Sequence, residues 1–314
     1  MIKSSICEQI GIKYPIFQGG MARISDGALA AAVSEAGGLG IVSAASGDVN
    51  QVGAELDIAR KLTDKPIGVN VMLRGENIEA LAKLIAEKKP AVVTTGAGNP
   101  ERYMDMWKAA GIKVIPVAAS ASFAKIFERA GADAVVAEGC ESGGHVGELT
   151  TMALVPQVCD AVSIPVIAAG GIADGRGAAA AFMLGAQGIQ IGTRFLVAEE
   201  CGAISRVYKE KVLKASDTST IVTGKRLGHP VRSIKSPFSR EYAKLEYTTI
   251  SNDDLEQFAV GSLGAAVNGD EKKGCFLAGQ IAGLVNKEQT CAEIIKEIFE
   301  EAETLLKGGA EWVR

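Results

Sequence analysis

The sequence has little of several features that mark other classes of protein. Of its 314 residues, 5% are aromatic and two are histidines. Its six cysteines are scattered, without a C-x-x-C pair or a Cys/His cluster. This argues against a zinc site or a disulfide framework, so no metal site is predicted, and it favours a reducing compartment. No apolar run reaches the ~18 residues of a membrane span, and the N-terminus lacks the apolar core of a signal peptide. We therefore expect a cytoplasmic protein with no membrane segment.

The chain also lacks the common nucleotide-binding motifs. It contains no G-x-x-x-x-G-K-[ST] and no G-x-G-x-x-G that opens a helix, so neither a P-loop nor a Rossmann-type dinucleotide site is expected. A net charge of −4 gives no overall sign of nucleic-acid binding. What the chain does have is 47% hydrophobic residues, enough for a substantial core, and 37 glycines. Its length suits one large α/β domain or two smaller ones.

Eight short apolar runs recur along the first two thirds of the chain, and their starts lie 21 to 31 residues apart. A β-then-α unit has about this length, and apolar runs without alternation indicate parallel strands covered on both faces. Eight successive units predict an α/β fold of the closed (β/α)8 TIM-barrel type, with a doubly wound open sheet as the alternative. The runs are Pro15–Gln18, Leu39–Val42, Pro66–Val71, Ala91–Thr94, Lys113–Val117, Ala134–Ala137, Pro165–Ala168 and Gly188–Ile191.

Glycines and polar residues collect where these runs end, and in such barrels ligands bind at the C-terminal ends of the strands. The last two runs lead into Gly170-Gly171 and Gly192-Thr193. Two such ends side by side predict a phosphate site made of backbone N–H groups. The sixth run ends at Glu138 and leads into a glycine-rich loop that carries His145. Histidine titrates near neutrality, so His145 is a candidate for proton transfer. The alternative is a structural histidine that caps a helix or bonds a carbonyl.

Beyond Thr193 the β-then-α periodicity fails. Residues 201–250 contain ten Lys or Arg against four Asp or Glu, so a basic segment is embedded in an acidic protein. It is either a docking face for an acidic partner or a phosphorylated substrate, or a solvated subdomain without a partner. Helical patterns resume at Leu255–Asn268. The segment Gly274–Gln280 either folds over the barrel mouth or forms an ordinary turn between helices. The cations of the basic segment include Lys225, Arg226, Arg232, Lys235 and Arg240, with His229 among them.

Seven segments carry a family resemblance: Tyr14–Ala22, Ala36–Gly40, Gly68–Asn70, Thr95–Pro100, Glu141–His145, Ile167–Ile172 and Gln190–Arg194. In this order they resemble the nitronate monooxygenase-related flavoproteins, and within that family the FMN-dependent enoyl-acyl-carrier-protein reductases II of bacterial fatty-acid synthesis. The resemblance covers nearly the whole chain. It implies an FMN-binding (β/α)8 barrel over residues 1–197 and 265–314 and an inserted cap or substrate subdomain over residues 198–264. It also implies one FMN, NADH or NADPH as co-substrate, and a homodimer.

The resemblance assigns residues to the flavin ring and to the reaction. Gly20 and Met21 would lie along the isoalloxazine, and Asn70 and Glu138 would bond to FMN. His145 matches the active-site histidine of the family. In the reductases it would deliver a proton to the α-carbon or polarise the thioester carbonyl.

The resemblance also assigns residues to the rest of the cofactor. Gly143-Gly144 would let their loop close on FMN. Gly170-Gly171 and Gly192-Thr193 would hold the phosphate, with Gln190 nearby. A monovalent cation, which some relatives require, is a further candidate ligand.

The reductase interpretation implies an acyl carrier protein as partner, which brings the trans-2-enoyl substrate. That carrier is acidic in this pathway, which suits the basic segment. The alternative is a nitronate monooxygenase, which oxidises nitroalkanes or nitronates with O2 and whose histidine deprotonates the nitroalkane. Such enzymes often have Gln where Glu138 stands and a different first-strand motif, and this favours the reductase. The second alternative is a non-catalytic flavin-binding protein.

Overall fold

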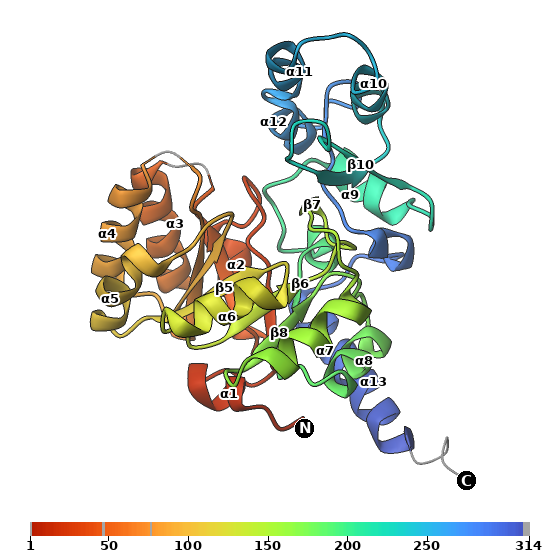
Figure 1. Ribbon diagram of the computed structural model, residues 1–314. Helices are drawn as coiled ribbons and strands as arrows, with labels where there is room; N and C mark the ends of the chain where they lie inside the picture. Colours follow the sequence, from red (N-terminus) through yellow and green to blue (C-terminus); the bar gives the residue numbers. More distant parts are fainter. Residues whose placement is uncertain (1, 46–47, 76, 310–314) are drawn as a thin grey trace.

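The chain folds around a closed barrel of eight parallel strands (Figure 1). The computed structural model describes residues 2–45, 48–75 and 77–309. The barrel closes between its first two strands, where Leu39 N donates to Ile16 O at 2.8 Å and Gln18 N donates to Leu39 O at 2.9 Å. The predicted (β/α)8 barrel is therefore confirmed, and the open sheet is excluded. Its strands, in spatial order, are β1 (Ile16–Gln18), β9 (Gly188–Ile191), β8 (Val166–Ala169), β6 (Val135–Glu138), β5 (Lys113–Ala118), β4 (Val92–Gly96), β3 (Ile67–Met72) and β2 (Gly40–Ser43).

Helices follow the barrel strands and cover the outside of the barrel. Asp26, Asp48 and Asp174 stand at N-caps, where their carboxylates accept backbone N–H groups of the first helical turn, as is typical of such positions. The covering helices are α2 (Gly27–Glu35), α3 (Val49–Leu62), α4 (Ile78–Lys88), α5 (Glu101–Ala109), α6 (Ala121–Arg129), α7 (Thr151–Ala161), α8 (Gly175–Met183) and α13 (Cys291–Gly308). None of the helices in the described ranges is both long and apolar enough to cross a membrane.

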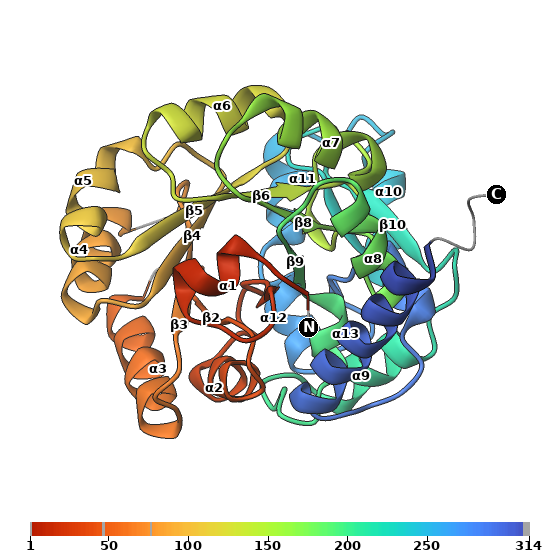
Figure 2. The ribbon, with the colours of Figure 1, turned by 90° about the horizontal axis from the view of Figure 1, so that it is seen from below.

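A short N-terminal helix, α1 (Ser5–Ile10), closes the bottom of the barrel (Figure 2). Its buried Ile6 and Ile10 belong to the same apolar cluster as Phe17, Ile115 and Ile167, which come from three barrel strands. This end is therefore filled with side chains, and the opposite end, where the strands finish, is left for ligands.

The chain leaves the barrel after β9 and returns only with α13. The elements between them are η1 (Thr193–Val197), α9 (Arg206–Leu213), β10 (Thr220–Thr223), β11 (Val231–Ile234), α10 (Pro237–Leu245), α11 (Asn252–Ala259), α12 (Ser262–Val267) and η2 (Gln280–Leu284). In Figure 1, β10 and α10 to α12 form a lobe above the C-terminal ends of the strands, and we call this lobe, together with β11, which pairs with β10, the cap. The boundaries at residues 198 and 264 stay predictions.

Two local predictions are corrected by the structure. Leu255–Asn268 is not one helical stretch, because Gly261 adopts a φ of +79° between α11 and α12. The loop after β6 contains a short strand, β7 (Gly144–His145), which pairs antiparallel with β11 of the cap, so that His145 lies opposite Val231. Val146 N extends the ladder by donating to Pro230 O at 3.0 Å. The cap thus fixes the backbone of the histidine loop.

Candidate active site

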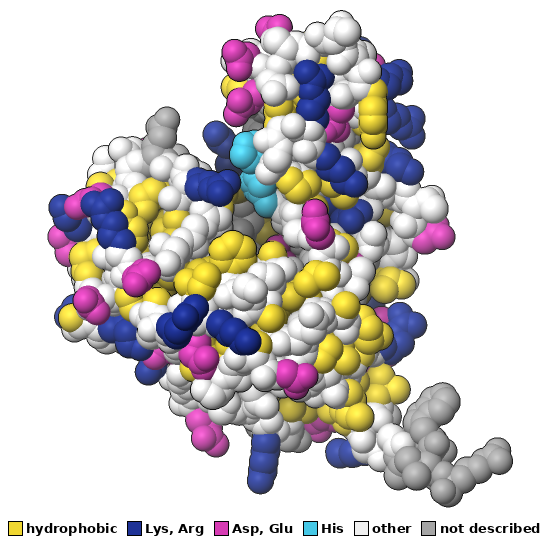
Figure 3. Space-filling view, in the orientation of Figure 1, with side chains coloured by type: hydrophobic (Ala, Val, Ile, Leu, Met, Phe, Trp, Pro, Cys, Tyr) yellow, Lys and Arg dark blue, Asp and Glu magenta, His cyan; other side chains and the backbone are white. Residues whose placement is uncertain are grey.

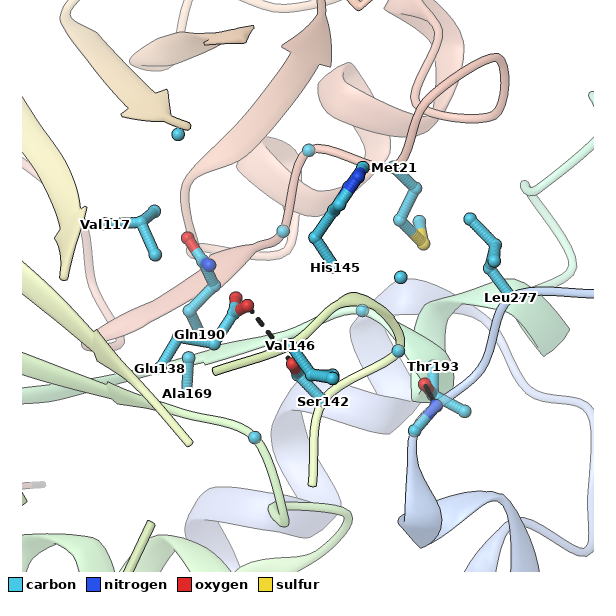
Figure 4. Close-up of a pocket in the computed structure, with 18 of the residues that line it drawn as sticks. Met21, Val117, Glu138, Ser142, His145, Val146, Ala169, Gln190, Thr193 and Leu277 are labelled. Carbon is cyan, nitrogen blue, oxygen red and sulfur yellow. Dashed lines mark hydrogen bonds between the residues drawn. The ribbon is translucent and has the colours of Figure 1, made fainter. Parts of the chain in front are cut away.

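A cavity of about 440 Å³ lies at the C-terminal end of the barrel (Figure 4). Strand ends of the barrel, the loop after β6 and the segment before η2 all contribute to its walls. Every residue that the sequence analysis assigned to catalysis or to FMN lines this one cavity: Gly20, Met21, Asn70, Glu138, Gly143, Gly144, His145, Gly170, Gly171, Gln190, Gly192 and Thr193. The structure therefore brings the whole predicted set together, while the role of each member stays a prediction.

The wall formed by β1 and β3 depends on a close approach at Gly20. A Cβ atom at Gly20 would lie 2.3 Å from Cβ of Asn70, so a side chain cannot be accommodated there. Thr94 Oγ1 donates to Asn70 Oδ1 at 2.9 Å, which leaves the Asn70 amide N–H groups for the cavity. Met21 N donates to Ser25 Oγ at 2.8 Å and thereby fixes the loop after β1. These hydrogen bonds hold the wall in place, and the wall presents a hydrogen-bond donor to a ligand.

The ends of β8 and β9 present backbone donors without protein acceptors. Within the described part of the chain, the N–H groups of Gly171 and Gly192 donate to no protein group. Gly171 adopts a φ of +73°, which glycine tolerates without strain. Thr193 Oγ1 accepts from Gly279 N at 2.8 Å, so its own proton remains available to a ligand. Free donors on two neighbouring strand ends fit the phosphate of a mononucleotide.

Glu138 is the ionisable group at the end of β6. Its side chain lines the cavity, and Ser142 Oγ donates to its Oε1 at 3.1 Å (Figure 4). Desolvation raises the pKa of the Glu138 carboxyl to about 7, and the hydrogen bond from Ser142 opposes that rise. A carboxyl with this pKa is present in both protonation states near neutral pH, so it can donate or accept a hydrogen bond to a bound ring.

The raised pKa of Glu138 gives a prediction for the protein freed of flavin. We expect Glu138→Gln to raise the midpoint of thermal unfolding over wild type by more at about pH 8 than at about pH 5.5. Between its ordinary pKa of 4.5 and its folded value of about 7, folded wild type keeps a proton that the unfolded chain releases. The free energy of unfolding of wild type therefore falls as pH rises through this window, and Gln does not titrate. Melting curves at both pH values, with exposed Glu148→Gln as the control, measure the effect. An equal gain at both values would contradict it.

His145 stands at the mouth of the cavity, and Figure 4 shows its imidazole pointing toward Met21. Its pKa is lowered from 6.5 by desolvation first, and then by the positive charges of His229 and Arg74. The imidazole is therefore neutral at neutral pH. In that state it can donate one hydrogen bond or accept one proton.

Sequence reasoning missed the residues that hold the loop after β6 in place. The Glu141 carboxylate accepts from Thr151 N and from Thr151 Oγ1, each at 3.0 Å, and so serves the N-terminus of α7. A Cβ at Gly143 would lie 2.6 Å from the carbonyl carbon of Ala278. Within the segment Gly274–Gln280, Leu277, Ala278 and Gly279 line the cavity, which agrees with a segment that folds over the barrel mouth. Glu141 lies in the segment Glu141–His145, which carries part of the family resemblance. Its hydrogen bonds to Thr151 could not be predicted, because they depend on where α7 begins.

Two arginines of the basic segment make hydrogen bonds inside the protein. Arg232 is buried and donates twice to Cys140 O, at 2.9 and 3.2 Å. Arg226 donates to Ile250 O at 2.6 Å within the cap. Arg232 is therefore covered by the protein itself, whereas Arg226 is exposed and its part in a docking face stays a prediction. Arg240 on α10 is exposed.

Comparison with known proteins places this fold and site in a class of flavoprotein oxidoreductases. The family model described as nitronate monooxygenase matches residues 3–301, so the chain belongs to the nitronate monooxygenase family. It is 34% identical to a probable nitronate monooxygenase of Staphylococcus aureus (strain Newman), with 78% of this chain and 81% of the relative covered. It is 30% identical to (3aS,4S,5R,7aS)-5-hydroxy-7a-methyl-1-oxo-octahydro-1H-indene-4-carboxyl-CoA dehydrogenase of Rhodococcus jostii (strain RHA1), over 96% of both chains.

The chain is also similar to solved structures of two proteins. The chain superposes on FabK from Thermotoga maritima with a TM-score of 0.97, 46% identity and full coverage of both chains. It superposes on nitroalkane oxidase from Streptomyces ansochromogenes with a TM-score of 0.87 and 28% identity, over 98% of this chain and 100% of the other.

Proposed function

We propose that this protein is an FMN-dependent enoyl-acyl-carrier-protein reductase. It would use NADH or NADPH to reduce trans-2-enoyl thioesters in bacterial fatty-acid synthesis. The observation that carries the proposal is the full-length similarity to FabK, an enoyl-acyl-carrier-protein reductase II, at 46% identity. The twelve residues around one cavity support it, because they give the cofactor and the substrate a common site.

The donors and glycines of the cavity fit FMN. Gly171, Gly192 and Thr193 would hold its phosphate, and Asn70 and Glu138 would bond to the ring. Bound FMN would supply hydride chemistry between a nicotinamide and the β-carbon of the unsaturated thioester. The role of the protein would be to hold this ring against the substrate and to keep the loop after β6 closed over both.

His145 would act on the thioester carbonyl. Negative charge builds on that oxygen during reduction and must be stabilised by a donor already in place. A neutral imidazole donates such a hydrogen bond without giving up its proton, and the lowered pKa of His145 keeps it in this state. Of the two roles expected from the sequence, the electrostatic environment favours polarisation of the carbonyl over delivery of a proton.

A nitronate monooxygenase is the second candidate, and one observation favours it. A neutral His145 is also ready to accept a proton from a nitroalkane, and the family match and the similarity to a nitroalkane oxidase agree with that role. The carboxyl of Glu138, where such enzymes often have an amide, favours the reductase.

Partner and cofactor preferences follow from the same proposal. An acyl carrier protein would bring the substrate, and exposed cations of the cap such as Arg240 are available to an acidic surface. A homodimer, the choice between NADH and NADPH, and a monovalent cation stay predictions.

One experiment separates the candidates. We expect purified protein to show a flavin spectrum and to oxidise NADH or NADPH in a reaction that depends on crotonyl thioester and yields butyryl thioester by mass spectrometry. Oxygen uptake with a nitroalkane, without any reduction of crotonyl thioester, would identify the second candidate. A flavin spectrum with neither activity would leave a flavin-binding protein and refute the proposal.

A further inference from the structure

Two basic side chains, Arg74 and His229, act electrostatically on His145 from different parts of the chain. Arg74 follows the end of β3, two residues after Met72, which lines the cavity. His229 lies on the turn between β10 and β11, where His229 N donates to Gly224 O at 3.0 Å. The residue after His229 pairs with the residue after His145 through the bond from Val146 to Pro230. Figure 3 shows both histidines of the chain together in the hollow between barrel and cap.

Among the residues that the structure describes, these two side chains have no acidic partner. Arg74 and His229 are exposed, and across the described ranges neither side chain has a hydrogen bond or ion pair. Of the described residues, His229 and Arg74 are those whose charge acts on His145, and both lower its pKa. In a chain with a net charge of −4, the Arg74 guanidinium beside imidazole N–H donors is a local group that an anionic ligand can bind.

We propose that Arg74 and His229 form a phosphate-binding subsite at the cavity mouth, for a phosphate ester carried by a ligand whose reactive end lies inside. The inference rests on the proposed function, which supplies two ligands of this chemistry. One is the enoyl thioester on a phosphopantetheine arm, and the other is the nicotinamide dinucleotide. Arginine binds phosphate oxygens with paired N–H donors, and an imidazole adds a further donor.

The subsite is tested by comparing substrates with and without phosphate. The variants are Arg74→Ala, His229→Gln and the double variant, with Arg240→Ala as a control for an exposed cation on α10 of the cap. For each we would measure kcat/KM for crotonyl-CoA and for the crotonyl thioester of N-acetylcysteamine, which carries no phosphate. We expect the ratio of the two values to fall about fivefold in each single variant and to hold in Arg240→Ala. Effects on folding or on His145 change both values alike and cancel in the ratio.

The second arm identifies the source of the phosphate. If the thioester ratio holds and kcat/KM for NADH falls about fivefold instead, the subsite takes the phosphate of the dinucleotide. If neither quantity moves, or if Arg240→Ala lowers them equally, the subsite is refuted. Calorimetric titration of the holoprotein with 4′-phosphopantetheine and with pantetheine tests the subsite without turnover. A wild type that prefers the phosphorylated form, and loses this preference in the double variant, keeps the subsite even if no enoyl thioester is reduced.

Discussion

Replacing Gly192 by Asp gives a folded protein that purifies without FMN. Gly192 has a φ of −118°, which any residue adopts, and the nearest atom that a Cβ would meet is Met21 Cγ at 3.6 Å. A side chain therefore enters the cavity without straining the backbone. Its carboxylate would stand among the N–H donors proposed for the phosphate, and like charges at such a site cost several kcal/mol, or at least about a hundredfold in affinity. The ratio of flavin to protein absorbance and a titration with FMN measure the loss.

Gly192→Ala is the matched control, because it adds a methyl group without charge and should keep bound flavin. Gly171 is a poorer position for this test, since its φ of +73° penalises any side chain. If Gly192→Asp protein carries a full complement of FMN, the phosphate does not bind at this rim of the barrel.

Replacing His145 by Ala abolishes most enoyl reduction and leaves the flavin bound. The backbone of β7 pairs with β11 whatever the side chain at this position, so the loop and the cofactor site should survive. Loss of one donor to a developing oxyanion costs about 10² to 10³ in kcat. Steady-state kinetics with crotonyl-CoA, together with the flavin spectrum of the variant, measure both parts of the prediction. If the turnover of the variant equals that of wild type, His145 has no role in the reaction.

His145→Gln distinguishes the two candidate functions. The Gln amide donates a hydrogen bond but does not accept a proton at neutral pH. If His145 polarises a thioester carbonyl, Gln should restore part of the activity that Ala loses. If His145 is the base that deprotonates a nitroalkane, Gln and Ala should be equally inactive with that substrate.

The course of the barrel and the ring of candidate residues could be predicted from local sequence. The spacing of apolar runs such as Ala134–Ala137 reports the length of one β-then-α unit, and the direction of a strand decides which of its ends reaches the ligand side. Gly170-Gly171 and Gly192-Thr193 could be placed on one rim for that reason. Each of these pairs could be interpreted from its own position in the sequence, because a glycine directly after a strand either leaves a free N–H group or makes a turn.

The tertiary structure alone decided how the loop after β6 is held and how its groups ionise. Nothing near His145 indicates that it pairs with Val231, because strand pairing between distant segments leaves no local pattern. The pKa of Glu138 depends on what encloses it, and the buried position of Arg232 depends on the carbonyl of Cys140 lying across from it. The sequence by itself determined the barrel and its ligand-binding end, since these follow from periodicity. Only the folded chain decided the charge at the mouth, since that depends on which distant side chains meet there.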